Sequence, residues 1–285
     1  MMNLRKKIIT RAFLLLLITT PFVNLLSLDK KSVLYRILKK KKLTVSVGAN
    51  YEPYYIDNPK PGYPGFEVEI AEKYADYLGV EIEKILPLNN FSEHALAVNQ
   101  GIVDLALGNS SSMIRMKYVY FSDPYLIVSV GGLVNKMILP PEQEGDIVLN
   151  KNFRSLLDLK SLSRLSFGVK EKTSNLDYIK SIYGQNQIME FKDDFVALEA
   201  LKDNKFNTYV ADNLYIEGLM QKDSSLKARF VALSAPIMEK QVSFCFKKYD
   251  LTTQADLNLF IREIKRTGEV NRLKEKYFNS NKWVK

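Results

Sequence analysis

Short apolar runs alternate with amphipathic segments along this chain, and the whole alternation occurs twice. In the first block the expected order is strand, helix, strand, helix, strand, at residues 43–49, 65–80, 81–88, 91–101 and 103–108. Apolar side chains recur at helical spacing in the two helical segments, and Gly79 and Gly101 end them. A chain with this order forms a parallel sheet with helices on its faces. The sequence therefore predicts an α/β fold.

The second block has the same order and a similar size. Its expected strands and helices are residues 165–169, 175–184, 187–191, 195–204 and 207–213. A local repeat supports the pairing of the blocks, because two triplets share one spacing: Gly101, Asp104, Asn109 and Asn204, Asn207, Asp212. Ligands of open α/β sheets bind outside the carboxyl ends of the strands, where Asn109 and Asp212 are expected. We therefore expect two similar lobes around a common cleft.

The distribution of charge argues against a nucleic-acid-binding protein. The 285 residues carry a net charge of +9. Of the 41 Lys and Arg and the 32 Asp and Glu, residues 1–42 hold eleven and one, which leaves 30 and 31 for residues 43–285. The body is therefore nearly neutral, whereas a nucleic-acid footprint places its excess on the folded domain.

Residues 1–42 have the form of an export signal. A basic start, "MMNLRKK", precedes the apolar residues 12–28, and a basic segment follows. The apolar stretch is also long enough for a short membrane anchor, and no small-x-small cleavage site follows it. The alternative is a buried N-terminal helix. We expect export, with the segment either cleaved or kept as an anchor.

One cysteine and one histidine limit the possible chemistry. Cys245 has no partner for a disulfide within the chain and is expected to be a core thiol. His94 cannot build a multi-histidine metal site alone, and we expect it on a helix surface or in the core. We therefore expect no metal and no cofactor.

Six stretches resemble, in family order, the family 3 solute-binding proteins, the extracytoplasmic receptors of polar amino-acid ATP-binding-cassette (ABC) importers. They are "LTVSVGANYEPYY", "GFEVEIAEKYADYLGV", "NQGIVDLALGNSSSMIRMKYVYFSDPY", "LSFGVKEKTSN", "ALKDNKFNTYVADN" and "TGEVNRLKEKYF", and they cover roughly residues 43–280. The most specific are the Gly-Phe-Glu-x-Glu helix start at Gly65 and the Arg-x-x-x-x-x-Phe-Ser-Asp-Pro-Tyr run at Arg115.

The resemblance implies a two-lobed periplasmic binding protein of type II (Venus flytrap) with two hinge crossings. Lobe 1 is expected to comprise residues 43–128 and 236–285, and lobe 2 residues 129–235. The hinges are expected near residues 126–130 and 232–238. Proteins of this family trap a ligand by closing the lobes. Between the blocks, residues 137–150 are expected to form a surface loop, and residues 256–278 two helices that meet at Gly268.

The stretch "GNSSSMIR" has the composition of an anion receptor. Ser110, Ser111 or Ser112 can cap a short helix beginning at "SMIRMK", and the free N–H groups of a helix start attract an anion. Arg115 adds a planar fork that suits a carboxylate. In the family, an arginine at this position binds the α-carboxylate of the ligand, with a serine or threonine close by. The alternative is a surface salt bridge of Arg115.

Asp212 is the expected partner of the ligand's ammonium group. It matches the family position that binds the amine, although Asp-Asn after a strand is also ordinary turn chemistry. The resemblance places Arg115 in lobe 1 and Asp212 in lobe 2. One zwitterion would therefore bridge the lobes, and only the closed form would satisfy both of its charges.

Other residues match family positions around the ligand. Tyr51 matches an aromatic residue that covers the ligand, whereas Tyr54 is expected to pack in the core. Thr173 and Ser174 match residues at a helix start that contact the carboxylate, and helix capping explains them equally well. Gly108 fits a place where a backbone carbonyl approaches the amine, or a plain turn. Lys170 and Glu171 face either the side-chain pocket or solvent.

The expected function is extracytoplasmic binding of a small polar α-amino acid, for delivery to the membrane permease of an ABC importer. The first alternative is an enzyme similar to the prephenate or arogenate (cyclohexadienyl) dehydratases, for which Glu171 and Glu52 are conceivable acids. The second alternative is a ligand sensor without transport. We expect a monomer with no catalytic residues and no nucleic-acid partner.

Overall fold

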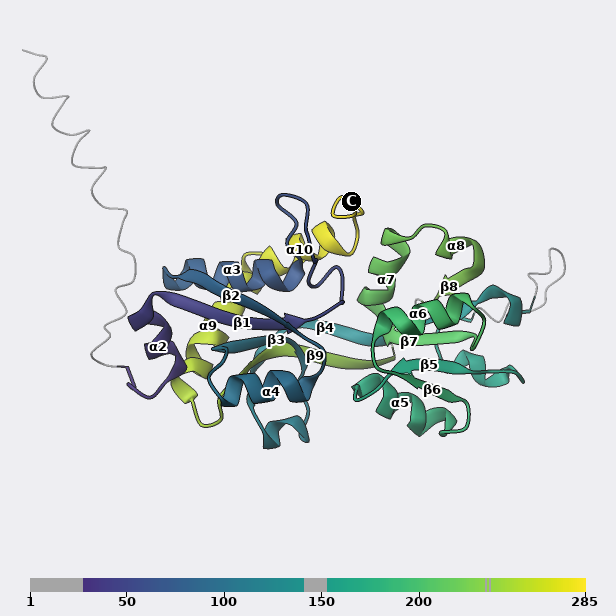
Figure 1. Cartoon of the computed structure of the whole chain (residues 1–285), viewed down its shortest axis with the longest axis horizontal. Coiled ribbons are helices and arrows are strands. Elements are labelled where there is room, and N and C mark those ends of the chain that lie inside the picture. Colours follow the sequence, from purple (N-terminus) through teal and green to yellow (C-terminus); the bar gives the residue numbers. More distant parts are fainter. Residues whose placement is uncertain (1–27, 141–152, 234, 236) are drawn as a thin grey trace, which may run out of the picture.

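The computed structural model describes residues 28–140, 153–233, 235 and 237–285, and these form one continuous sheet with helices on both faces (Figure 1). The strand order is β2-β1-β3-β9-β4-β7-β5-β6, and β8 pairs with β4. The strands are β1 (Lys42–Gly48), β2 (Glu81–Leu88), β3 (Leu105–Ser110), β4 (Tyr120–Asn135), β5 (Phe167–Lys170), β6 (Ile188–Phe191), β7 (Thr208–Asp212), β8 (Phe230–Ala232) and β9 (Ile237–Phe246). The two-lobed α/β fold expected from the sequence is confirmed.

Each lobe is one end of this sheet with its own helices (Figure 1). Lobe 1 contains β2, β1 and β3, and lobe 2 contains β7, β5 and β6. The helices of lobe 1 are α2 (Val33–Lys40), α3 (Phe66–Leu78), α4 (Phe91–Asn99), α9 (Leu251–Arg266) and α10 (Glu269–Tyr277). The helices of lobe 2 are α5 (Ser174–Tyr183), α6 (Asp194–Lys202), α7 (Asn213–Lys222) and α8 (Leu226–Arg229). Short 3-10 turns are η2 (Arg115–Lys117), η3 (Lys136–Ile138) and η4 (Asp158–Ser161).

Two long strands connect the lobes. Strand β4 pairs with β9 from Tyr120 to Val130 and then with β7 from Val130 to Val134. Strand β9 runs beside it in the opposite direction, and it also pairs with β3 of lobe 1. We propose that the hinge lies at residues 126–130 of β4 and at residues 232–238, which precede and begin β9.

Helix α3 shows how local sequence sets the element boundaries. Its residues Phe66, Ile70 and Tyr74 recur at helical spacing and are fully buried. The helix ends at Gly79, whose φ of 63° lies in the left-handed region that glycine adopts without strain. The apolar spacing and the glycine together predict this helix within two residues of its observed bounds.

The folded body begins earlier than the first expected strand. Part of the basic segment forms helix α2, capped by Ser32, with four buried apolar side chains: Val33, Leu34, Ile37 and Leu38. The Leu34 N–H donates to the Thr253 hydroxyl of α9 at 2.9 Å, and Arg36 pairs with Asp104 at 2.7 Å. Helix α2 is therefore an integral part of lobe 1. The expected export signal and most of the expected loop at 137–150 lie outside the described residues.

The single cysteine and the single histidine are both buried. The Cys245 thiol lies in β9 inside the core, as expected, and burial raises its pKa above the ordinary value. His94 is buried on α4, and its Nδ1 is 2.8 Å from the Ser46 hydroxyl. Burial lowers the pKa of His94 to about 4, so the ring is neutral at pH 7. Among the described helices, none is long and apolar enough to cross a membrane.

Candidate functional site

A cleft between the lobes contains all eight candidate ligand-binding residues. An inner cavity of about 120 Å³ is lined by residues of both lobes, and it shares several of these residues with an adjacent outer cavity of about 850 Å³. The candidates that line the inner cavity are Tyr51, Gly108, Ser110, Arg115, Thr173, Ser174 and Asp212. Ser112 lines the outer one. The structure thus brings together side chains separated by up to 161 positions, from Tyr51 to Asp212.

Arg115 lies at the junction of the two cavities. Its guanidinium lies over the Phe91 ring, 4.5 Å from the ring centroid, and donates to the Ser110 carbonyl at 2.9 Å. Burial lowers the pKa of Arg115, but an arginine remains charged at any physiological pH. No acidic side chain among the described residues forms an ion pair with it. A positive charge held against an aromatic ring and lacking an acidic partner is suited to an anionic ligand.

The helix expected after the three serines is only one turn. Arg115–Lys117 form the 3-10 turn η2, and the Ser112 hydroxyl accepts a hydrogen bond from the Arg115 N–H at 3.3 Å. The N-cap of this turn is Ile114, without a side-chain cap, so no serine caps it, and the expectation of a helix whose dipole attracts an anion is wrong. A helix dipole needs several aligned peptide units, and this segment lacks them because the chain turns at once into β4.

A longer helix does begin at the cleft, in lobe 2. Helix α5 has ten residues and starts at Ser174. The Thr173 hydroxyl accepts from the Leu176 N–H at 3.2 Å and thereby caps the helix. Both residues line the inner cavity, so the capping role and a position at the site coexist.

Asp212 ends β7 directly before α7, but its carboxylate does not cap that helix. It accepts hydrogen bonds from the Asn175 amide at 3.0 Å and from the ammonium of Lys240 on β9. Lys240 also donates to the Asn175 Oδ1 at 2.7 Å. The ordinary turn chemistry considered for Asp212 is therefore absent here, and a cation of the chain itself contacts the carboxylate.

Three further residues line the inner cavity and were not expected there from the sequence: Asn175, Asp194 and Lys240. Lys240 lies on the same face of its strand as the apolar Val242, Phe244 and Phe246, so alternation places its side chain on the buried side but does not identify its partner. Asp194, at the start of α6, pairs with Lys170 at 3.1 Å and accepts a hydrogen bond from Tyr209 at 2.5 Å. Burial raises the pKa of Asp194, and Lys170 opposes this shift. The pairing places Lys170 inside the cleft and not in solvent.

A buried acid, Glu67, lies against Gly108 in the wall of the inner cavity. Gly108 has a φ of 73°, and a side chain there would collide with the Glu67 carboxyl, 2.5 Å from the position of a Cβ. The Gly108 N–H donates to the Tyr125 hydroxyl at 2.8 Å, and that hydroxyl donates to Glu67 Oε1 at 3.3 Å. Burial raises the pKa of Glu67 to about 8 from its ordinary 4.5. The glycine is required here because the acid approaches the backbone closely.

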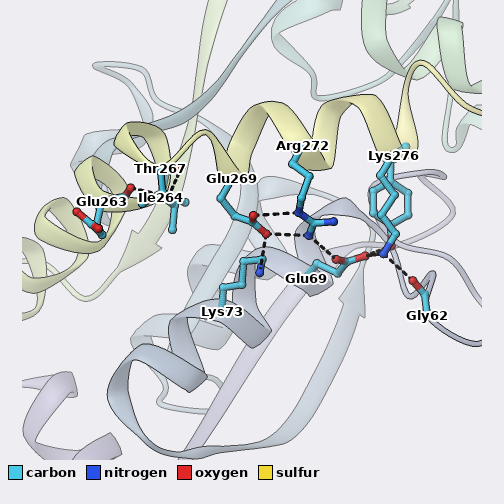
Figure 2. Close-up of polar contacts among 10 residues, drawn as sticks. Gly62, Glu69, Lys73, Glu263, Ile264, Thr267, Glu269, Arg272 and Lys276 are labelled. Carbon is cyan, nitrogen blue, oxygen red and sulfur yellow. Dashed lines mark hydrogen bonds and ion pairs between the residues drawn. The ribbon is translucent and has the colours of Figure 1, made fainter. Parts of the chain in front are cut away.

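The second acid of the Gly-Phe-Glu-x-Glu motif faces helix α10 instead (Figure 2). Glu69 accepts hydrogen bonds from Lys276 and from the Tyr277 hydroxyl, and lies 3.5 Å from Arg272. Arg272 also pairs with Glu269 at 2.7 Å. The two acids of the motif therefore have different roles: Glu67 lies against Gly108, which lines the inner cavity, and Glu69 binds α10 to α3.

The two candidate aromatic residues have different surroundings. Tyr51 lines the inner cavity and stacks on Tyr215 of α7. Tyr54 is buried and contacts Phe66 and Phe278, as expected for a packing residue.

The acids considered for catalysis lie in ion pairs. Glu52 pairs with Lys222, and Glu171 lies 3.5 Å from Lys172. No cluster of histidine, cysteine or acidic side chains within the described residues could hold a metal ion.

Comparison with known proteins agrees with this two-lobed arrangement. The arginine-binding extracellular protein ArtP of Bacillus subtilis is 27% identical over 249 residues, which are 85% of this chain and 88% of that protein. The membrane-bound lytic murein transglycosylase F of Photobacterium profundum is 25% identical over 88% of this chain, but the chain spans only 46% of its length. An amino acid ABC transporter substrate-binding protein from Streptococcus pneumoniae, solved with L-arginine, has a TM-score of 0.71 at 20% identity and covers 86% of this chain and 97% of its own.

The family assignment rests on most of the chain. The model of the bacterial extracellular solute-binding proteins, family 3, matches residues 43–280, which include both lobes and both connecting strands. The resemblance noted in the sequence is confirmed, and this chain belongs to the bacterial extracellular solute-binding proteins, family 3.

Proposed function

We propose that the protein binds a small α-amino acid between its lobes and delivers it to the permease of an ABC importer. The observation that carries this proposal is that Arg115 of lobe 1 and Asp212 of lobe 2 line one inner cavity. Arg115 would bind the carboxylate of the ligand, and Asp212 would be the acceptor for its ammonium group. Hinge closure would follow because the ligand makes contacts with both charges only when the lobes approach.

The relatives support this class of ligand. ArtP and the L-cystine-binding protein TcyJ of Escherichia coli are amino-acid-binding proteins by name, and neither is named as an enzyme. The extracellular family implies an extracytoplasmic location. We propose a binding role without catalysis, because Glu52 and Glu171 are held in ion pairs.

A thermal-shift screen of the twenty proteinogenic amino acids, small dicarboxylates and prephenate tests the proposal. A ligand present at 100 times its Kd stabilises the folded state by about 2.7 kcal/mol. We expect a shift with at least one amino acid. Arg115→Ala should raise its Kd at least tenfold, since hydrogen bonds to charged groups contribute about 1.5–3 kcal/mol. Arg115→Lys keeps the charge but loses the planar fork, and its Kd should lie between those of wild type and Arg115→Ala.

Two results would contradict this proposal. One is a wild-type protein that binds none of the amino acids but binds or converts prephenate. The other is an amino-acid affinity that Arg115→Ala leaves unchanged, because the ligand would then lie elsewhere.

A further inference from the structure

We propose that Lys240 occupies the place of the ligand's ammonium group, and that it thereby sets how strongly the cleft prefers an amino acid over the corresponding 2-oxo acid. The inference rests on the proposed function and concerns the same cavity. It assigns a specificity-determining role to a residue of the connecting strand.

The position of Lys240 is fixed by the strand that carries it. In the β4–β9 ladder Lys240 lies opposite Val128, within the segment that joins the lobes. Its side chain is only 5% exposed, and its ammonium contacts both Asp212 and Asn175 of lobe 2. Lys240 and Asp212 both line the inner cavity. The contact is thus a built arrangement of three polar side chains within the cavity wall.

The contact weakens the attraction of Asp212 for the ammonium group of a ligand. A buried carboxylate binds a cation strongly because an unpaired buried charge is costly. Asp212 already has such a cation, so a second ammonium group at the same oxygen gains less and is repelled by the Lys240 charge. An amino acid must therefore displace Lys240 or leave its own ammonium without the carboxylate. A 2-oxo acid, which has no ammonium, leaves the Lys240–Asp212 pair undisturbed.

The other charged residues of the inner cavity, apart from Arg115, also lie in ion pairs. Lys170 is paired with Asp194, and Lys172 lies 3.5 Å from Glu171. Among the described residues that line the cavity, Arg115 is then the charged group with no ion pair. The cavity therefore presents one uncompensated positive charge for a carboxylate, whereas a ligand's ammonium group has to compete with Lys240 for Asp212.

Binding measurements on Lys240 variants test this role. Isothermal titration is carried out with all twenty amino acids and with the 2-oxo acids of alanine, glutamate, glutamine, methionine and arginine, using wild type, Lys240→Met and Lys240→Gln. We expect Lys240→Met to bind at least one amino acid ten or more times tighter than wild type, a change of about 1.4 kcal/mol. The affinity for the matching 2-oxo acid should stay the same or fall. Lys240→Gln should show the same direction.

Two controls separate the role of Lys240 from general effects. Lys247→Met removes a positive charge just beyond β9, on an exposed residue, and should leave every affinity unchanged. In the double variant Lys240→Met/Asp212→Asn the gain in amino-acid affinity should disappear, because the freed carboxylate is no longer present. Thermal unfolding of each variant reports whether it is folded.

The outcomes distinguish this inference from the proposed function. If folded Lys240→Met and Lys240→Gln bind no amino acid tighter than wild type does, the role of Lys240 is wrong, even if wild type binds amino acids. If wild type binds none of the twenty and Lys240→Met binds one, the role of Lys240 stands, and the native ligand lacks the amine. A gain that persists after Asp212→Asn would also overturn the inference.

Discussion

Tyr51 of lobe 1 stacks on Tyr215 of lobe 2, with ring centroids 4.1 Å apart and ring planes 8° from parallel. The contact is one of three between the loop after β1 and helix α7. Glu52 pairs with Lys222, and Pro53 lies against Gly218. Residues 215, 218 and 222 are spaced three and four apart and so lie on one face of the helix. This face of α7 is therefore a direct contact between the lobes beside the cavity.

Loss of the stacked pair should weaken ligand binding. Aromatic pairs contribute about 0.5–1.5 kcal/mol beyond the area they bury. If the stack favours the approach of the lobes, Tyr215→Ala should raise the Kd of a bound amino acid roughly 2- to 12-fold. Tyr215→Phe keeps the ring and is the control, which should bind like wild type. Equal affinities of the Ala and Phe variants in isothermal titration would show that the stack does not contribute.

Gly218→Ala tests the same contact through sterics. Alanine is ordinarily the better residue inside a helix by about 0.5–1 kcal/mol. At this position its Cβ would lie 2.4 Å from the Pro53 Cδ, which is too close for any real contact. We therefore expect a weaker ligand affinity and no gain in melting temperature. A higher melting temperature with unchanged affinity would mean that the loop moves aside freely.

Glu67 should make the protein less stable as the pH rises. Its folded-state pKa is raised to about 8, above the ordinary 4.5. The folded state therefore holds a proton that the unfolded chain has lost between these values, and the free energy of unfolding falls with increasing pH by at most about 1.4 kcal/mol per unit. Glu67→Gln keeps the shape without the titration. Urea unfolding at pH 6.5, 7 and 8 should show a fall for wild type that the variant lacks.

The chosen pH range separates Glu67 from two other groups. The folded-state pKa of His94 is lowered to about 4, so its contribution is lost as the pH falls below its ordinary 6.5. Hydrogen bonding from Arg272 lowers the pKa of Glu269 to about 2, so its contribution is lost only in acid. A fall between pH 6.5 and 8 that persists in Glu67→Gln would therefore contradict the assignment to Glu67.

The buried ion pairs between α3 and α10 should contribute more to stability than the exposed pair within α9 (Figure 2). Glu69 is largely buried and accepts from Lys276 and Tyr277, so Glu69→Gln should lower the free energy of unfolding by about 1–3 kcal/mol. Glu263 pairs with Arg266 on the exposed side of α9. Glu263→Gln should therefore change the free energy of unfolding by less than about 0.5 kcal/mol. Urea unfolding measures both. Similar losses in the two variants would mean that burial does not matter here.

The sequence by itself determined the order and type of the elements. Apolar spacing and the glycines at 79, 101, 184 and 268 predicted helices and strands close to those found, because these signals act between residues a few positions apart. The alternation of two blocks predicted the two lobes. The polar residues that follow the strands predicted which end of each sheet half faces the cleft, so Arg115 and Asp212 both line its inner cavity.

Only the tertiary structure decided what those polar residues contact. Alternation along β9 puts Lys240 on the same face as the buried Val242, Phe244 and Phe246, but it cannot identify Asp212, 28 positions away, as the partner of Lys240. The register of β9 against β4 places it in the cavity wall. Likewise, the basic segment before β1 forms helix α2 with four buried apolar side chains, and "SMIRMK" forms only one turn because β4 begins at Tyr120. In each case the deciding contact joins residues that are distant in the chain, where periodicity carries no information.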